Sequence, residues 1–237
     1  MKPETRNLKL MVIAIDGPAG SGKSTAARHL AGALGFTYLN TGAMYRAVAF
    51  VAKEGGIDLS HDKRVGEVAR KMRFEYQLKD GQQRFIVNGG DRTRELFTAA
   101  LTEQLKPVVN NLAVRDALVK KMREAARAVL SQGVPGVVME GRDIGTVVFP
   151  AAVLKFYIHA DLEERTRRRA AELEARGEPV DLDGLRKQIR YRDDTDRARS
   201  VGPLVQAADA IDVDTTHLDE NGTLKRLLEE ARARGLA

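Results

Sequence analysis

Residues 14–30 read "AIDGPAGSGKSTAARHL", and this stretch decides the fold because a glycine-rich turn joins an apolar run to a helical pattern. The preceding run, residues 10–15 ("LMVIAI"), is almost wholly apolar, which is typical of a strand buried on both faces of a parallel sheet. The following residues, "STAARHLAGAL", repeat apolar side chains at helical spacing. The stretch therefore predicts a strand, a glycine turn and a helix in direct succession.

The turn matches the pattern G-x-x-x-x-G-K-[ST], with Lys23 and Ser24 at its end. Glycines let successive backbone N–H groups curve around a phosphate, and the helix that follows adds free N–H groups and a positive dipole end. Lys23 is expected to bridge the terminal phosphates, and the Ser24 hydroxyl to hold Mg²⁺. The alternative is a turn that only joins two elements, but the flanking strand and helix favour a nucleoside triphosphate site. Its expected ATP-binding residues are Gly17, Pro18, Ala19, Gly20, Ser21, Gly22, Lys23, Ser24 and Thr25.

The composition of the chain limits the classes of protein to which it can belong. The chain has 237 residues, 43% of them hydrophobic, and carries no cysteine, which excludes a disulfide scaffold and fits a reducing compartment. No apolar run approaches the ~18 residues of a membrane span, and residues 1–9 are charged and predict no signal peptide. The expectation is a cytoplasmic monomer without membrane partners. A net charge of +6 suits an anionic partner, either a nucleic acid or a phosphorylated small molecule.

Two stretches near strand ends carry groups suited to a phosphorylated acceptor. In "TYLNTGAMYRAVAF", Thr41 is expected to end a short strand and Arg46 to lie in the first turns of the next helix; a surface arginine is the alternative. In "GVVMEGRDIGTVVFP", Glu140, Arg142 and Asp143 follow an apolar run. Residues beyond the carboxyl ends of parallel strands line ligand sites, so packing alone explains these three charges poorly.

Two arginine-rich stretches lie further along the chain. "DLEERTRRRAAELEARGE" reads as a helix with arginines at i, i+3 and i+4, which could neutralise transferring phosphates or form a solvated or nucleic-acid-binding face. "YRDDTDRARSVGPL" reads as a helix whose charged stripe would grip phosphate and sugar groups, or would form ordinary ion pairs. The residues concerned are Arg165, Arg168 and Arg169 in the first stretch, and Arg192, Asp196 and Arg199 in the second.

The order of apolar runs predicts a doubly wound α/β core with parallel strands. The expected strands are residues 10–15, 37–39, 136–139, 153–158 and 210–213. An insertion of about residues 46–111 contains a predicted antiparallel hairpin that turns at Asp80-Gly81. A second insertion, about residues 161–199, reads as a helical lid, which leaves a core of about residues 10–45, 112–160 and 200–237. Residues 221–237 predict a final amphipathic helix.

Four of these stretches together resemble the bacterial cytidylate kinases, P-loop kinases that transfer the γ-phosphoryl group of ATP to CMP and dCMP. They are "IDGPAGSGKSTAARHLAGALGFTYLNTGAMYRA", "EGRDIGTVVFP", "EERTRRR" and "YRDDTDRARSVGPLVQAADAIDVDTT". The resemblance implies a five-stranded parallel core with an inserted acceptor-binding domain, which holds a small antiparallel sheet and helices, and a helical lid. It further implies ATP, CMP or dCMP and Mg²⁺ as ligands, and no nucleic acid.

The resemblance also assigns roles to individual residues. Lys23, Arg142 and the lid arginines Arg165, Arg168 and Arg169 would act in catalysis, and Ser24 would hold Mg²⁺, with Glu140 as a further candidate near the ion. The implied CMP-binding residues are Thr41, Arg46, Arg115, Arg142, Asp143, Arg192, Asp196 and Arg199.

The chain departs from the family pattern in four places. Thr41 stands where the family usually has a serine. Glu140 stands where the family usually has aspartate, Phe97 stands in "LFT" where the family tends to read "IRT", and Lys106 replaces a serine. The alternatives left open are a kinase for UMP or AMP and, from another class, a P-loop protein that binds RNA through its basic lid.

Overall fold

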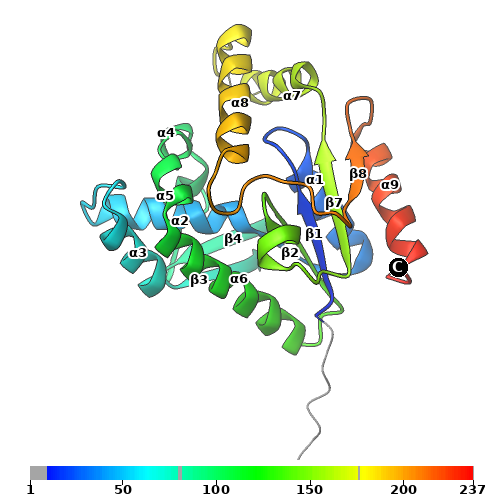
Figure 1. The fold of residues 1–237 in the computed structure, drawn as a ribbon, viewed down its shortest axis with the longest axis horizontal. Helices are drawn as coiled ribbons and strands as arrows, with labels where there is room; N and C mark the ends of the chain where they lie inside the picture. Colours follow the sequence, from blue (N-terminus) through cyan, green and yellow to red (C-terminus); the bar gives the residue numbers. More distant parts are fainter. Residues whose placement is uncertain (1–9, 80–81, 176, 237) are drawn as a thin grey trace, which may run out of the picture. The chain divides into compact units, whose positions relative to one another are not determined.

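The computed structural model describes residues 10–79, 82–175 and 177–236 (Figure 1). The charged leader and the predicted Asp80-Gly81 turn lie outside the described residues. The described chain divides into two compact units. Unit 1 comprises residues 10–38, 125–198 and 202–236, and unit 2 comprises residues 39–124 and 199–201.

The described part of the chain contains a five-stranded parallel sheet in the order β2-β6-β1-β7-β8. β1 pairs in parallel with β6 and β7, and β7 pairs in parallel with β8. All residues of β1 and β6 are buried, as their continuous apolar sequence predicts for strands covered on both faces. The strands are β1 (Val12–Asp16), β2 (Thr37–Asn40), β6 (Val137–Gly141), β7 (Leu154–His159) and β8 (Ile211–Asp214). The predicted parallel core is confirmed, with boundaries shifted by one or two residues.

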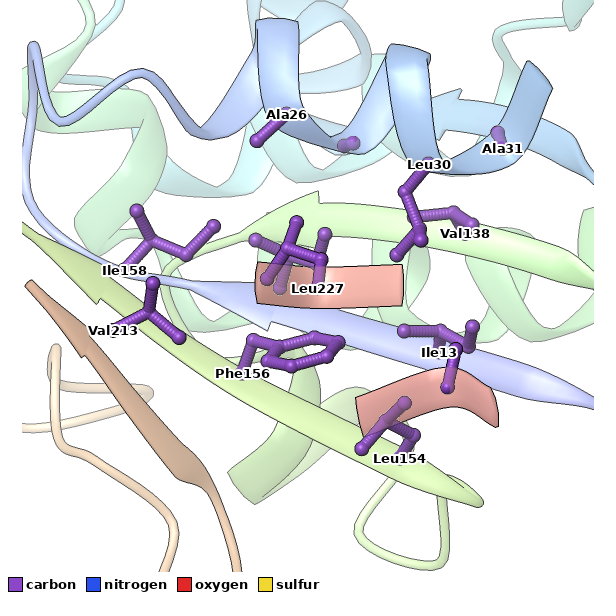
Figure 2. Packing of buried hydrophobic residues seen from close by; sticks show 13 residues of the cluster. Ile13, Ala26, Leu30, Ala31, Val138, Leu154, Phe156, Ile158, Val213 and Leu227 are labelled. Atoms are coloured by element: carbon purple, nitrogen blue, oxygen red, sulfur yellow. The ribbon is translucent and has the colours of Figure 1, made fainter. Parts of the chain in front are cut away.

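The core of unit 1 lies between the sheet and the helices α1 (Lys23–Leu34) and α9 (Glu220–Ala233). Figure 2 shows Leu30 of α1 directed toward Val138 of β6, and Leu227 of α9 beside Phe156 of β7. These side chains are fully or almost fully buried, and each contributes about 1.5–3 kcal/mol through removal from water. The predicted C-terminal amphipathic helix is confirmed as α9.

Helices α7 (Leu162–Glu174) and α8 (Leu182–Arg197) also belong to unit 1 and follow β7 in the chain. They pack on each other through Ala170, Leu185 and Ile189. Their loop contains Gly177 with φ of 74°, and α8 begins after Asp181. The two helices predicted from the arginine-rich sequence are therefore present. The end of α8 at Arg197 corrects one expectation, because Arg199 lies beyond the helix and does not share a helical stripe with Arg192 and Asp196.

Unit 2 combines helices with a three-stranded antiparallel sheet in the described residues, in the order β3-β4-β5. The predicted hairpin is confirmed, with Phe74 opposite Val87 and Tyr76 opposite Phe85. The elements are α2 (Thr41–Glu54), α3 (Asp62–Lys71), β3 (Phe74–Lys79), β4 (Gln82–Val87), β5 (Gly90–Asp91), η1 (Glu95–Phe97), α4 (Ala99–Glu103), α5 (Lys106–Asn110) and the first part of α6 (Leu112–Ser131). Thr41 starts α2 and does not end β2, so that local prediction was wrong: the Asn40 side chain accepts a hydrogen bond from Ala43 N (3.1 Å) and caps the helix there.

Candidate phosphate and acceptor site

The glycine-rich turn joins the end of β1 to α1. Gly17 has φ of 151°, and a Cβ there would lie 1.9 Å from the Ile158 carbonyl oxygen, so β7 leaves room only for glycine. Gly22 has φ of 81° and is the N-cap residue of α1. With no side chain at Gly22, the first N–H groups of the helix have no side-chain cap. A helix start of this kind, with its positive dipole end, is suited to an anion.

Lys23 is the first residue of α1, and its side chain reaches back to the turn. Its Nζ donates to the Pro18 carbonyl oxygen at 2.5 Å and to Ser21 Oγ at 3.4 Å, and its side chain is buried. The pKa of Lys23 is lowered from 10.5 to about 7, mainly by burial and also by the nearby cations Arg142 and Arg192, against the opposing effect of the carboxylates. A buried cation held by carbonyl and hydroxyl oxygens is poorly neutralised, so this position favours an added negative charge.

Charged residues from two other elements of unit 1 surround the Lys23 ammonium. Glu140 is the second-last residue of β6, Arg142 follows the end of that strand at Gly141, and Arg192 and Asp196 come from α8. All four interact electrostatically with Lys23. Arg142 Nε donates to Asp196 Oδ2 at 2.8 Å and Nη1 donates to the Gly141 carbonyl oxygen at 3.0 Å. Unit 1 thus brings together the P-loop lysine with predicted residues that lie more than a hundred positions away in the sequence.

The pKa of Arg142 reflects this pairing. Burial alone lowers the pKa of Arg142, but the Asp196 and Glu140 carboxylates raise it, and on balance the pKa is raised. Arg142 therefore stays cationic, and Asp196 fixes the orientation of its guanidinium group. Asp143, the next residue, is buried as well.

Ser24 and Glu140 form the second feature beside the turn. Ser24 Oγ donates to Glu140 Oε1 at 2.9 Å, and the Tyr38 hydroxyl donates to the same oxygen at 3.2 Å. The two sequence candidates for holding Mg²⁺ are therefore in contact. Among the residues that the structure describes, no group of three or more His, Asp or Glu side chains suits a metal ion.

The three arginines Arg165, Arg168 and Arg169 have different partners, although all lie on α7. Arg165 is buried and donates to Asp193 Oδ2 (2.6 Å), to the Ala19 carbonyl oxygen of the P-loop (3.0 Å) and to the Ala160 carbonyl oxygen (2.9 Å). It therefore connects α7, α8 and the phosphate loop.

Arg168 and Arg169 lie on the following part of α7. Arg168 donates to Glu164 Oε1 (2.7 Å) and to the Thr215 carbonyl oxygen (2.5 Å), and its Nη1 lies 3.6 Å from the position of a Cβ on Gly22. Arg169 pairs with Glu172 at 2.7 Å. Arg165 and Arg168 thus border the phosphate loop, whereas Arg169 pairs with a residue of its own helix.

The remaining acceptor candidates belong to unit 2. Thr41 is buried at the first position of α2, and Arg46 lies in its second turn, where Nη1 donates to the Gly42 carbonyl oxygen at 3.1 Å. Arg115 is buried near the start of α6. Arg199 also belongs to this unit. Lys106 begins α5, where Pro107 occupies the first turn, a favourable position for proline.

Sequence reasoning missed Asp16, the last residue of β1. Its buried carboxylate accepts hydrogen bonds from Ile144 N (2.8 Å) and Gly145 N (2.7 Å), the first residues of the π-helical turn η2 (Ile144–Val148). The pKa of Asp16 is raised to about 6, mainly by burial and also by the neighbouring Asp143, although the two N–H groups and Lys23 lower it. Asp16 thereby fixes the segment that follows Arg142 and Asp143. The available signal was a carboxylate at the carboxyl end of an apolar strand.

Within the described ranges, no helix is both long and apolar enough to cross a lipid bilayer. The parallel sheet, the glycine turn with its buried lysine and the surrounding arginines together define a P-loop kinase fold. A family model described as "Cytidylate kinase" matches residues 13–233. The chain belongs to the cytidylate kinase family.

Individual relatives are similar over almost the whole chain. A protein of Pseudomonas savastanoi pv. phaseolicola named cytidylate kinase is 41% identical over 97% of this chain and 99% of its own length. A protein of Exiguobacterium sibiricum with the same name is 42% identical over 94% of this chain and 98% of its own length. A crystal structure from Thermus thermophilus covers 94% of this chain and 97% of its own, at 19% identity and a TM-score of 0.48.

Proposed function

We propose that this protein transfers the γ-phosphoryl group of ATP to CMP and dCMP, which yields ADP and CDP or dCDP. One observation carries the proposal: Ser24 of the P-loop donates to Glu140 of β6 at 2.9 Å, and Arg142, two positions later, donates to Asp196 of α8 at 2.8 Å. A triphosphate site alone requires only the P-loop. The additional arginines and carboxylates in the same cluster supply the groups that a second, phosphorylated and hydroxyl-bearing substrate requires.

ATP would bind through the loop of residues 17–25, which supplies backbone N–H groups, the Lys23 ammonium and the start of α1. Mg²⁺ fits beside it, because the Ser24 hydroxyl and the Glu140 carboxylate lie within 2.9 Å of each other and both are hard oxygen ligands. Such a pair suits an ion that keeps phosphate oxygens and waters as its other ligands. When bound, Mg²⁺ supplies charge neutralisation at the phosphates.

The proposed acceptor contacts are given for each unit by itself. In unit 1, Arg142 and Arg192 would hold the acceptor phosphate, Asp143 would accept from the cytosine amino group, and Asp196 would accept from the sugar hydroxyls while it orients Arg142. In unit 2, the proposed contacts are Thr41, Arg46, Arg115 and Arg199.

Phosphoryl transfer passes through a loose transition state and requires mainly alignment and charge neutralisation. The acceptor is an ionised phosphate at neutral pH, so it needs no strong general base. Lys23, Arg142 and Arg168 would stabilise the developing charge, because they lie in or beside the phosphate loop. We assign Arg165 and Arg169 to the lid as well; the buried Arg165–Asp193 pair connects the lid helices to the loop.

The proposed division of the chain is a core of about residues 10–45, 112–160 and 200–237, an acceptor segment of about 46–111 and a lid of about 161–199. The compactness of residues 39–124 supports an acceptor segment of roughly this extent. The absence of cysteine from the sequence fits a cytoplasmic protein, and we propose that it acts as a monomer.

A coupled assay that detects ADP tests the function, with CMP, dCMP, UMP, AMP and GMP offered in turn. We expect CMP and dCMP to give the highest kcat/KM, and the Lys23→Ala variant to give almost none with any acceptor. Preference for AMP or UMP would overturn the cytosine assignment. High affinity for RNA with a steep salt dependence, and no transfer to any monophosphate, would favour an RNA-binding protein.

A further inference from the structure

Phe97 is one of the few large apolar side chains that the described structure exposes, with 41% of its surface accessible. It ends η1 in unit 2, in the "LFT" stretch that departs from the family pattern. A single exposed aromatic residue is common on protein surfaces and needs no explanation by itself. The contacts of this ring, however, are with a residue of the proposed acceptor site.

The Arg46 guanidinium lies over the Phe97 ring, with its Cζ 5.2 Å from the ring centroid. This is the distance range of a cation–π interaction, in which the ring face attracts the positive charge. The same guanidinium donates to the Gly42 carbonyl oxygen at 3.1 Å. Arg46 is therefore held from two sides, by a main-chain acceptor of its own helix and by an aromatic ring from a segment about fifty positions later.

Phe97 is itself held by an aromatic cluster of the small sheet, which consists of Phe74, Tyr76 and Phe85. The centroids of Phe85 and Phe97 are 5.4 Å apart, and Phe85 packs on both Phe74 and Tyr76. The Tyr76 hydroxyl donates to the Asn40 carbonyl oxygen at 2.8 Å, and Asn40 caps α2. The sheet thus supports the start of α2 and the Arg46 side chain through the same group of rings.

We propose that Phe97 is a positioning residue that fixes the Arg46 guanidinium for the phosphate of the acceptor nucleotide. This inference rests on the proposed function, because it takes Arg46 as a contact of the acceptor phosphate. A long arginine side chain loses rotamer freedom when it binds a ligand, and a guanidinium that is already fixed loses less. The small antiparallel sheet then contributes to function, because its aromatic residues support the Phe97 ring that orders this arginine.

Phe97→Leu keeps the apolar character of the position and removes the ring face. We expect KM for CMP to rise roughly three- to thirty-fold, the range of a single cation–π contact, with kcat and KM for ATP within about twofold of wild type. Phe97→Tyr keeps a ring face and is expected to restore wild-type KM. Leu112→Ala is the matched control, because Leu112 is an exposed apolar residue of the same unit.

A double-mutant cycle separates positioning from general support of the unit. In the Arg46→Ala background, Phe97→Leu is expected to leave KM for CMP unchanged, because the guanidinium that it orders is gone. Gly42→Ala supplies an independent check: a Cβ there would lie 2.9 Å from Arg46 Nη1 and would displace the group, so it should raise KM for CMP with Phe97 intact.

The inference is overturned if Phe97→Leu leaves KM for CMP unchanged, if it raises KM for CMP and ATP alike, or if its effect persists in the Arg46→Ala background. These outcomes leave the proposed function intact, because the wild-type enzyme still phosphorylates CMP. A wild-type protein that phosphorylates no monophosphate would instead overturn the proposed function, and this inference with it.

Discussion

Each of the two units holds a cation that we propose to bind a phosphate, and the two cations are held by different means. In unit 1 the Lys23 ammonium is buried and bonded to a carbonyl and a hydroxyl oxygen of its own loop. In unit 2 the Arg46 guanidinium lies on the partly exposed Phe97 ring, which other rings support. The first arrangement depends on the conformation of one short segment, and the second depends on side chains from separate segments.

This difference decides how strongly each site responds to mutation. A cation inside a backbone loop is close to the reacting phosphates, and its removal withdraws charge stabilisation from the transition state. A cation that an aromatic ring orders is a binding group, and its displacement costs affinity for one substrate. Substitutions in the two units should therefore separate into effects on kcat and effects on the KM of the acceptor.

The largest effect is expected for Lys23→Ala. Loss of the ammonium should reduce kcat by about a thousandfold or more, as measured with saturating ATP and CMP. The fold should persist, because removing a buried cation whose pKa is depressed to about 7 leaves no unpaired charge in the core. Lys120→Ala, at an exposed position of α6, is the control. Near-wild-type turnover by the folded Lys23→Ala variant would contradict the assignment.

The next prediction concerns how the free energy of unfolding depends on pH. It compares the carboxylate of Asp16 in unit 1 with that of Asp58 in unit 2. Asp16 has a pKa raised to about 6 from 3.8, so its contribution to stability is present below pH 3.8 and is lost as the pH rises through 6. Above that pH the ionised buried group costs about 3 kcal/mol of unfolding free energy. The unfolding free energy of the Asp16→Asn variant should not show this fall between pH 4 and pH 7. Urea unfolding at a series of pH values measures it.

Asp58 of unit 2 is expected to affect the free energy of unfolding with the opposite dependence on pH. It accepts from Ser60 N (2.9 Å) and Ser60 Oγ (2.8 Å), which lower its pKa. Its contribution is therefore present above the unfolded pKa and is lost as the pH falls through the folded value. Asp58→Asn should remove a stabilisation that wild type has at neutral pH.

Parallel curves of unfolding free energy against pH for wild type and Asp16→Asn would contradict the role of Asp16.

A smaller effect is expected for Arg192→Ala, which tests the acceptor side of unit 1. Loss of a charge-assisted hydrogen bond to phosphate should raise KM for CMP about ten- to a hundredfold, with a smaller change in KM for ATP. Arg190→Ala, at an exposed position of the same helix, should behave as wild type. An effect confined to KM for ATP would count against assigning Arg192 to the acceptor.

Much of unit 1 could be predicted from the sequence, for a physical reason. Continuous apolar runs such as β1 specify strands buried on both faces, and the glycines at 17 and 22 specify backbone conformations that few other residues adopt. Both signals are local. The cluster at the strand ends was also predictable, because topology brings the carboxyl ends of parallel strands to one edge.

The remaining features depend on contacts between distant residues. Nothing near Asp16 in the sequence indicates that its carboxylate accepts two N–H groups from a turn about 130 positions later. Arg165 was expected to act on phosphates, and its bonds to Asp193 and to the carbonyl oxygens of Ala19 and Ala160 could not be predicted from its helix alone. The contact between Arg46 and Phe97 also joins distant residues, and the sequence did not predict it. Side-chain packing between elements selects these partners, and local propensity does not.

Transfer of label from γ-labelled ATP tests the central claim most directly. The purified protein is incubated with Mg²⁺, labelled ATP and an equimolar mixture of CMP, UMP, AMP and GMP, and the products are separated. The account predicts that label appears first and most abundantly in CDP, and that Lys23→Ala abolishes it. Label in ADP or UDP ahead of CDP, or label only in inorganic phosphate, would contradict it.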